Sequence, residues 1–349
     1  MNFEWPWLAM FGNLVAWCNM AITMKRRSFL QSSSRAMIAA AAVPHLSAGA
    51  ESRRKIVDTH QHLWDPDRIN PPWLQTAPEI IRSRHHLKEY QAATAGYDVS
   101  AVYMEIDVAP ADLDREAAEV IALCRDPSVP TLAATIGGRP DAADFPAYVE
   151  RHSASGFVRG VRQVLHGPST PTGHCLRPEF IKGVRYLGSK GLHFDLCLRP
   201  GELLDGAKLA SECPETRFVV DHCGNADVKA FHPALQVGEK PEHSVDHWKS
   251  GIDALAGKAN TICKISGIIA RLPEKAAPGL LAPIVNHCLD AFGPERVVFG
   301  GDWPVCLLGG TWRQWVEGLA EIIQTRPEAE REALWRGNAL KFYKLPSAP

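Results

Sequence analysis

The sequence predicts an α/β protein folded as a single-domain (β/α)8 TIM barrel. Three observations support this fold. First, short apolar runs alternate along the chain with segments of helical periodicity. Second, there are eight such apolar runs. The roughly 300 residues that carry them match the usual size of the fold. An open doubly wound sheet is the alternative, but no Gly-x-Gly-x-x-Gly motif follows the first run.

The predicted strands are short runs rich in β-branched and aromatic residues, as expected for strands buried on both faces. The first begins at Ile56 and Val57, and the others cover residues 101–106, 131–136, 157–162, 194–198, 218–222, 261–265 and 296–302. Amphipathic segments between them predict helices. These cover residues 87–95, 112–125, 144–152, 178–190 and 201–212.

Composition and charge narrow the classes of partner. The chain has 349 residues, 46% hydrophobic, with a formal net charge of -1 and no long basic run. The charge therefore gives no reason to expect binding to nucleic acid or to an anionic membrane surface. A small molecule is the expected partner. Nine cysteines are scattered without a Cys-x-x-Cys pair, so neither a disulfide framework nor a zinc knuckle is indicated. The oligomeric state is left open.

Residues 1–50 differ from the rest and are interpreted as a leader preceding a domain at 51–349. Residues 25–31, Lys-Arg-Arg-Ser-Phe-Leu-Gln, resemble a twin-arginine export signal. An alanine-rich apolar stretch follows at 37–43, and Ala-Gly-Ala at 48–50 has the form of a cleavage site. The expected location is therefore periplasmic or otherwise exported, with no membrane contact once the signal is removed.

The alternative for the leader is a membrane anchor. Residues 5–24 are uncharged and apolar, so they suit a span of about 20 residues if Met1 is the true start. A start at Met24 explains more of the signal.

Ionisable side chains gather at the predicted carboxyl ends of the strands, where barrel enzymes build their sites. His60 and His62 are two residues apart, so in extended backbone their imidazoles project from one face. If these residues were only exposed to solvent, they would be distributed over both ends of the strands and over the helices. The other candidates at these ends are Glu105, Arg162, His222, Lys264, Ser266 and Asp302.

Four motifs together resemble the amidohydrolase superfamily, and within it the branch of sugar-lactone and related lactone hydrolases. They are Asp58-Thr59-His60-Gln61-His62, Gly160-Val161-Arg162, Asp221-His222-Cys223-Gly224 and Phe299-Gly300-Gly301-Asp302-Trp303-Pro304. Residues 336–343 are also similar to the C-terminal helix of that branch. The resemblance covers roughly residues 55–345 and implies a barrel hydrolase.

The resemblance also bears on metal content. Binuclear members carry a lysine at the end of strand 4 and a histidine on strand 5, whereas this chain has Arg162 and the run Phe-Asp-Leu-Cys-Leu at 194–198. At most one ion is therefore expected. Either one zinc-like divalent ion is held by His60, His62 and Asp302, joined by Glu105 or His222, or no ion is used and the imidazoles and Arg162 act unaided.

The residues suit hydrolysis of a sugar-derived or carboxylated lactone by an activated water. Asp302 is the predicted general base, because Gly300 and Gly301 leave room beside its carboxylate. His222 orients water or protonates the leaving group, or else it is a neutral histidine bonded to a loop.

Two cationic side chains complete the predicted site. Arg162 offers a planar fork to a carboxylate or oxyanion, or else forms a structural ion pair with a neighbour such as Glu105. Lys264 is a predicted substrate contact. A non-oxidative decarboxylase of the same superfamily is the alternative function, and a non-catalytic binding protein is disfavoured by the retained Asp302.

Overall fold

The computed structural model describes residues 53–235, 240–273 and 275–346. The predicted leader, with its export signal and alternative anchor, lies outside these residues. Within the described part of the chain, no helix combines the length and apolar character needed to cross a bilayer.

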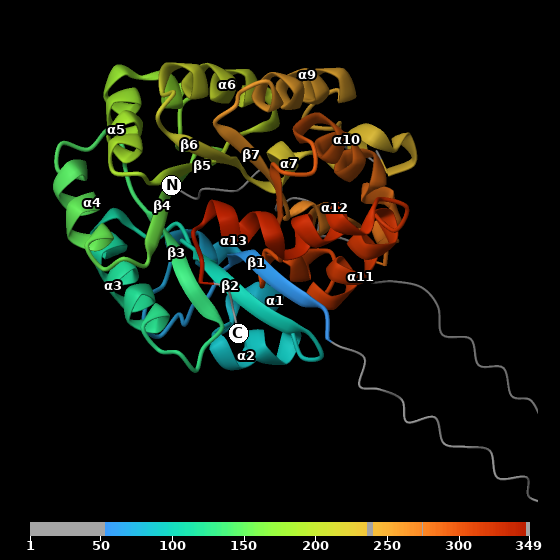
Figure 1. Ribbon diagram of the computed structural model, residues 1–349, viewed down its shortest axis with the longest axis horizontal. Helices are drawn as coiled ribbons and strands as arrows, with labels where there is room; N and C mark the ends of the chain where they lie inside the picture. The colour runs from blue at the N-terminus through green and yellow to red at the C-terminus, as the bar shows by residue number, and fades with distance from the viewer. Residues whose placement is uncertain (1–52, 236–239, 274, 347–349) are drawn as a thin grey trace, which may run out of the picture. The chain divides into compact units, whose positions relative to one another are not determined.

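Eight parallel strands, each hydrogen-bonded to the next in chain order, form the barrel (Figure 1). Backbone bonds continue from the last strand to the first, with the Asp302 N–H donating to the His60 carbonyl at 2.9 Å and the His62 N–H to that of Trp303 at 2.9 Å. The predicted barrel is confirmed. The strands are β1 (Lys55–Gln61), β2 (Asp98–Met104), β3 (Thr131–Gly137), β4 (Val158–Val164), β5 (His193–Cys197), β6 (Arg217–Val220), β7 (Thr261–Ile265) and β8 (Val297–Phe299).

Helices cover the outside of the barrel (Figure 1). Apolar faces at helical spacing bury each of the long ones against the strands. The long helices are α3 (Leu113–Cys124), α4 (Phe145–Ser153), α5 (Pro178–Ser189), α6 (Leu203–Glu212), α9 (Val245–Ala256), α10 (Ala282–Phe292) and α11 (Trp312–Ile322). The short ones are α1 (Glu79–Arg82), α2 (Leu87–Ala93), α7 (His222–Asn225), α8 (Val228–Phe231), α12 (Glu328–Glu332) and α13 (Asn338–Phe342).

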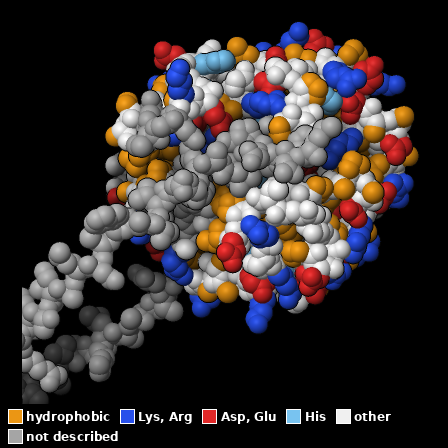
Figure 2. Space-filling model, turned by 180° about the vertical axis from the view of Figure 1, so that it is seen from behind, with side chains coloured by type: hydrophobic (Ala, Val, Ile, Leu, Met, Phe, Trp, Pro, Cys, Tyr) orange, Lys and Arg blue, Asp and Glu red, His pale blue; other side chains and the backbone are white. Residues whose placement is uncertain are grey.

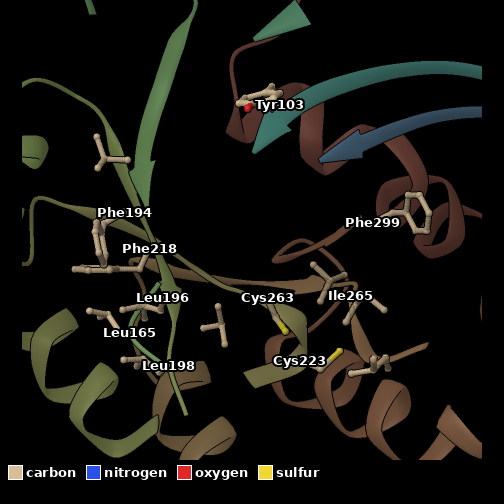
Figure 3. Close-up of a cluster of buried hydrophobic side chains, with 14 of the residues drawn as sticks. Tyr103, Leu165, Phe194, Leu196, Leu198, Phe218, Cys223, Cys263, Ile265 and Phe299 are labelled. Atoms are coloured by element: carbon tan, nitrogen blue, oxygen red, sulfur yellow. The ribbon is translucent and has the colours of Figure 1, made fainter. Parts of the chain in front are cut away.

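Alternation along the strands divides the core into two layers. Residues such as Phe194, Phe218, Ile265 and Phe299 belong to the large cluster between strands and helices (Figure 3). Their neighbours on the opposite face form a second cluster, which includes Val219, Val298 and Tyr343 near the end of the chain. The same alternation turns Asp195 and Lys264 toward each other, with their charged atoms 2.7 Å apart.

Four strands end earlier than predicted: β2 at Met104 and β5 at Cys197 instead of residues 106 and 198, and the sixth and eighth strands at positions that bear on the site. The sixth was expected to reach residue 222 and the eighth residue 302, but β6 ends at Val220 and β8 at Phe299. Both His222 and Asp302 have positive φ, 52° and 53°, which is incompatible with a continuing strand. Both side chains are therefore set by turns that follow the strands.

Candidate active site

Three side chains from two adjoining strand ends converge at one point. His62 Nε2 lies 3.4 Å and His60 Nε2 3.7 Å from the same carboxylate oxygen, Oδ1 of Asp302. All three residues are buried, and their potential ligand atoms lie within 4.8 Å of one another. The structure thus brings together the core of the predicted site.

A buried carboxylate, Asp58, fixes the backbone that carries these groups. It accepts hydrogen bonds from the N–H of Gly301 at 2.7 Å, the indole of Trp312 at 2.9 Å, the hydroxyl of Tyr90 at 2.9 Å and the N–H of His60 at 3.0 Å. Burial raises the pKa of Asp58, and these four donors oppose the rise. A Cβ on Gly301 would lie 2.2 Å from the Trp312 nitrogen, so this close approach requires glycine.

Unusual backbone conformation marks two of the predicted residues. Non-glycine residues seldom adopt the left-handed region, yet Asp302 and His222 both do, and Cys223, Gly224 and Asn225 continue it with φ of 51°, 67° and 54°. Such conformations cost roughly 1–3 kcal/mol each and cluster at functional sites. The strain is an indication of function that does not depend on residue type.

The second nitrogen of two histidines is held by a protein group. His62 Nδ1 lies 3.0 Å from the Met104 carbonyl, so it donates there and leaves Nε2 with a lone pair. His222 Nδ1 lies 3.0 Å from Ser266 Oγ. Burial, reinforced by the charge of Lys264, lowers the pKa of His60, and burial lowers that of His222. Neutral imidazoles are the form that binds metal or accepts a proton.

Arg162 makes the ion pair that was its alternative role. Its Nε donates to Glu105 Oε1 at 2.6 Å and its Nη2 to the Glu105 carbonyl at 2.7 Å. The remaining nitrogen, Nη1, lies 3.4 Å from His60 Nε2 and 3.6 Å from Asp221 Oδ2. Glu105 therefore faces Arg162, and it does not belong to the metal-capable group of His60, His62 and Asp302.

Lys264, the predicted substrate contact, lies inside the barrel without exposed surface. Its ammonium is 2.7 Å from Asp195 Oδ2 and 3.0 Å from Asp221 Oδ1. Although burial opposes its protonation, the charges of these two carboxylates raise the pKa of Lys264. The observed contacts are those of a charge-balancing group.

Two residues of this network, Asp221 and Asp195, were not predicted as site residues. Asp221 lies 3.7 Å from His60 Nδ1 and next to His222, and strand alternation assigns only one of two successive residues to a given face. This alternation does not apply beyond β6, because the chain leaves the extended conformation at His222 and begins a left-handed turn. Asp195 could have been found from the sequence, because it is a charged residue inside the apolar run 194–198, and a buried charge must be paired.

A histidine does occur on β5, outside the predicted run. His193 begins that strand, and its Nε2 lies 3.0 Å from Asp195 Oδ1. Its ring packs on Phe342 and Tyr343 near the end of the chain. It thus contacts the C-terminal segment rather than the group formed by His60, His62 and Asp302.

The residues fit one metal ion. Two imidazoles whose Nε2 atoms face one carboxylate form, together with it, a donor set typical of a catalytic zinc site, which keeps a further position open. A second possible group, His60 with Asp221 and His222, shares His60 with the first. His60 Nδ1 has no hydrogen-bond partner although it is buried. Buried polar atoms without a partner are rare, and this one is consistent with a functional role for His60.

The chain is similar in sequence to two lactonases. The chain is 28% identical over 306 residues to L-fucono-1,5-lactonase of Burkholderia multivorans, covering 83% of this chain and 96% of that protein. It is 24% identical to L-rhamnono-gamma-lactonase of Scheffersomyces stipitis, covering 84% and 100%.

Solved structures agree on the fold. A zinc-bound amidohydrolase from Burkholderia multivorans superposes with a TM-score of 0.70 at 24% identity, covering 83% of this chain and 99% of the other. The amidohydrolase family matches residues 57–345, almost the whole described barrel. With the strand-end histidines and aspartate at its centre, the chain belongs to the amidohydrolase family.

Proposed function

We propose that the protein hydrolyses a lactone, with Asp302 as the general base. One observation carries the proposal: the imidazoles of His62 and His60 direct their Nε2 atoms at a single oxygen of Asp302, 3.4 and 3.7 Å away. The two lactonases described above are the relatives that support it.

Ring opening needs an activated water, a stabilised oxyanion and a proton for the departing alkoxide. Asp302 takes the proton of the attacking water. His222, half-buried and held through Nδ1 by Ser266, passes this proton from Asp302 to the ring oxygen as the C–O bond breaks. Arg162 places positive charge beside His60 through Nη1, where it stabilises the oxyanion.

His60, His62 and Asp302 would hold a single zinc-like ion. Such an ion, when bound, polarises a carbonyl and lowers the pKa of water. Asp221 and Arg162 then orient and balance His60. Lys264 contributes charge balance through Asp195 and Asp221, and we do not place it against the substrate.

The test is a panel of aldonolactones and pyrone carboxylates, scored by acidification with a pH indicator. As-isolated and chelator-treated protein are compared, and bound metal is measured. We expect acidification with at least one lactone and no more than one equivalent of ion. Release of CO2 from hydroxybenzoates without acidification by any lactone would favour the decarboxylase, and two ions both needed for activity would contradict the single-ion site.

We also propose export by the twin-arginine motif at residues 25–31. Replacing Arg26 and Arg27 together by lysine should leave the protein in the cytoplasm, as measured by fractionation. Equal periplasmic amounts of variant and unaltered protein would contradict export by this route.

A further inference from the structure

Three cysteines meet outside the proposed active site. Cys223 in the turn after β6, Cys263 on β7 and Cys288 on α10 are each fully buried. Their sulfur atoms all lie within 4.8 Å of one another, and Figure 3 shows the sulfurs of Cys223 and Cys263 in the buried layer. Side chains far apart in the sequence thus form one cluster, called here the thiol cluster.

The surroundings of the thiol cluster are apolar. All three cysteines belong to the large hydrophobic layer between strands and helices, and Trp248 and Ile252 of α9 belong to the same layer. Among the described residues, no histidine, aspartate or glutamate joins the three sulfurs as a fourth ligand. The donor set is therefore sulfur alone, three-coordinate and shielded from water.

We propose that the thiol cluster is a site for a soft monovalent cation, Cu(I). Thiolate ligands select Cu(I), zinc and iron–sulfur clusters, but structural zinc is almost always four-coordinate. An electrically neutral buried site needs one thiolate with a monovalent ion and two with a divalent ion, so Cu(I) displaces fewer thiol protons. Each S–Cu bond to a thiolate replaces an S–H bond, and the proton passes to solvent.

An ion at the thiol cluster would stabilise the turn that contains His222. Cys223 follows His222 directly and has a φ of 51°, and its carbonyl accepts a hydrogen bond from Trp248 at 2.9 Å. An ion bridging Cys223 to β7 and α10 holds this left-handed turn from behind. The inference concerns metal binding alone and does not depend on the proposed lactonase activity.

The test is an anaerobic Cu(I) titration of reduced protein against a chromophoric Cu(I) chelator. The His62→Ala background removes the histidine site from the count. We expect about one equivalent of tightly held copper, a near-ultraviolet thiolate-to-Cu(I) band, and a raised melting temperature. Cys288→Ala should lose the ion and the band. Cys175→Ala, at a buried cysteine outside the cluster, is the matched control and should keep both.

A titration in which Cys288→Ala and Cys175→Ala retain equal copper would overturn the proposal. X-ray absorption on copper-loaded protein with unaltered cysteines provides a readout that survives if a variant fails to fold. A shell of sulfur alone supports the thiol cluster. A shell of nitrogen or oxygen, or absence of the near-ultraviolet band, identifies the three cysteines as packing residues only.

Discussion

The charged groups inside the barrel form two sets that differ in how completely they are paired. In the closed set, Arg162 and Glu105 are 2.6 Å apart and Lys264 and Asp195 are 2.7 Å apart. In the open set, His60 and His62 stand 3.7 and 3.4 Å from Asp302, beyond good hydrogen-bond distance. The open set is held by contacts behind it, because Asp58 accepts from the N–H groups of His60 and Gly301 and the Met104 carbonyl lies 3.0 Å from His62 Nδ1.

The difference in pairing distinguishes residues that contribute to stability from residues that are available for chemistry. Buried ions at short distance satisfy one another, and removing one partner leaves the other uncompensated. Groups that converge without bonding leave room for a water, an ion or a substrate atom. We therefore expect changes in the open set to affect turnover and changes in the closed set to affect folding.

The largest expected effect is that of Asp302→Asn on turnover. Removing a positioned general base typically lowers kcat/KM about 10²- to 10⁴-fold. Thermal unfolding should change little, because Asn keeps the shape of the side chain. Asp98→Asn, at an exposed carboxylate, is the control and should retain full activity. Near-normal rates in a correctly folded Asp302→Asn protein would remove Asp302 from the base role.

Lys264→Met tests the closed set through stability. Asp195 and Asp221 would remain buried without their cation, and breaking a buried pair typically costs about 3–5 kcal/mol. Lys190→Met is the matched control, since Lys190 pairs with Glu150 at the surface and such pairs contribute about 0–1 kcal/mol. Chemical denaturation measures both. Equal losses in the two variants would show that Lys264 does not balance charge.

Arg162 belongs to both sets, because Nε and Nη2 bind Glu105 and Nη1 faces His60. An ammonium cannot supply these parallel bonds, so Arg162→Lys should lower the melting temperature and reduce kcat/KM roughly ten- to a hundredfold. Both are measured on one preparation. A lowered melting temperature with unchanged activity per folded molecule would leave Arg162 in the closed set alone.

The effect of pH on stability concerns Glu116 on α3. Tyr103 and the N–H of Ile106 donate to its Oε1 at 2.9 and 2.8 Å, and burial followed by the charge of Glu105 raises the pKa of Glu116 to about 8. Folded protein thus keeps a proton that the unfolded chain loses above an ordinary value of 4.5. Ionisation therefore makes the folded state less stable as the pH rises between these values.

Glu116→Gln removes this dependence. Relative to the unaltered protein, its free energy of unfolding should rise by up to about 1.4 kcal/mol per pH unit across that window. Glu119→Gln, on the same helix with its side chain partly exposed, is the control. Denaturation at several pH values measures the difference. A Glu116→Gln difference that stays constant with pH would contradict the shifted pKa.

The sequence by itself determined the barrel and predicted the residues that meet at the core of the candidate site. Short apolar runs and amphipathic segments report burial locally, so strand number and order follow from the chain alone. The strand-end rule then brought His60, His62 and Asp302 together. Local patterns do not report which charges meet across the barrel, because those distances join strands far apart in the sequence.

Only the tertiary structure decided the pairing. It placed Glu105 on Arg162, buried Lys264 between Asp195 and Asp221, and turned both Asp221 and His222 toward the site by a left-handed turn. No pattern of residue types specifies that turn, since three of its four residues are not glycine and enter the strained region only because surrounding contacts hold them there.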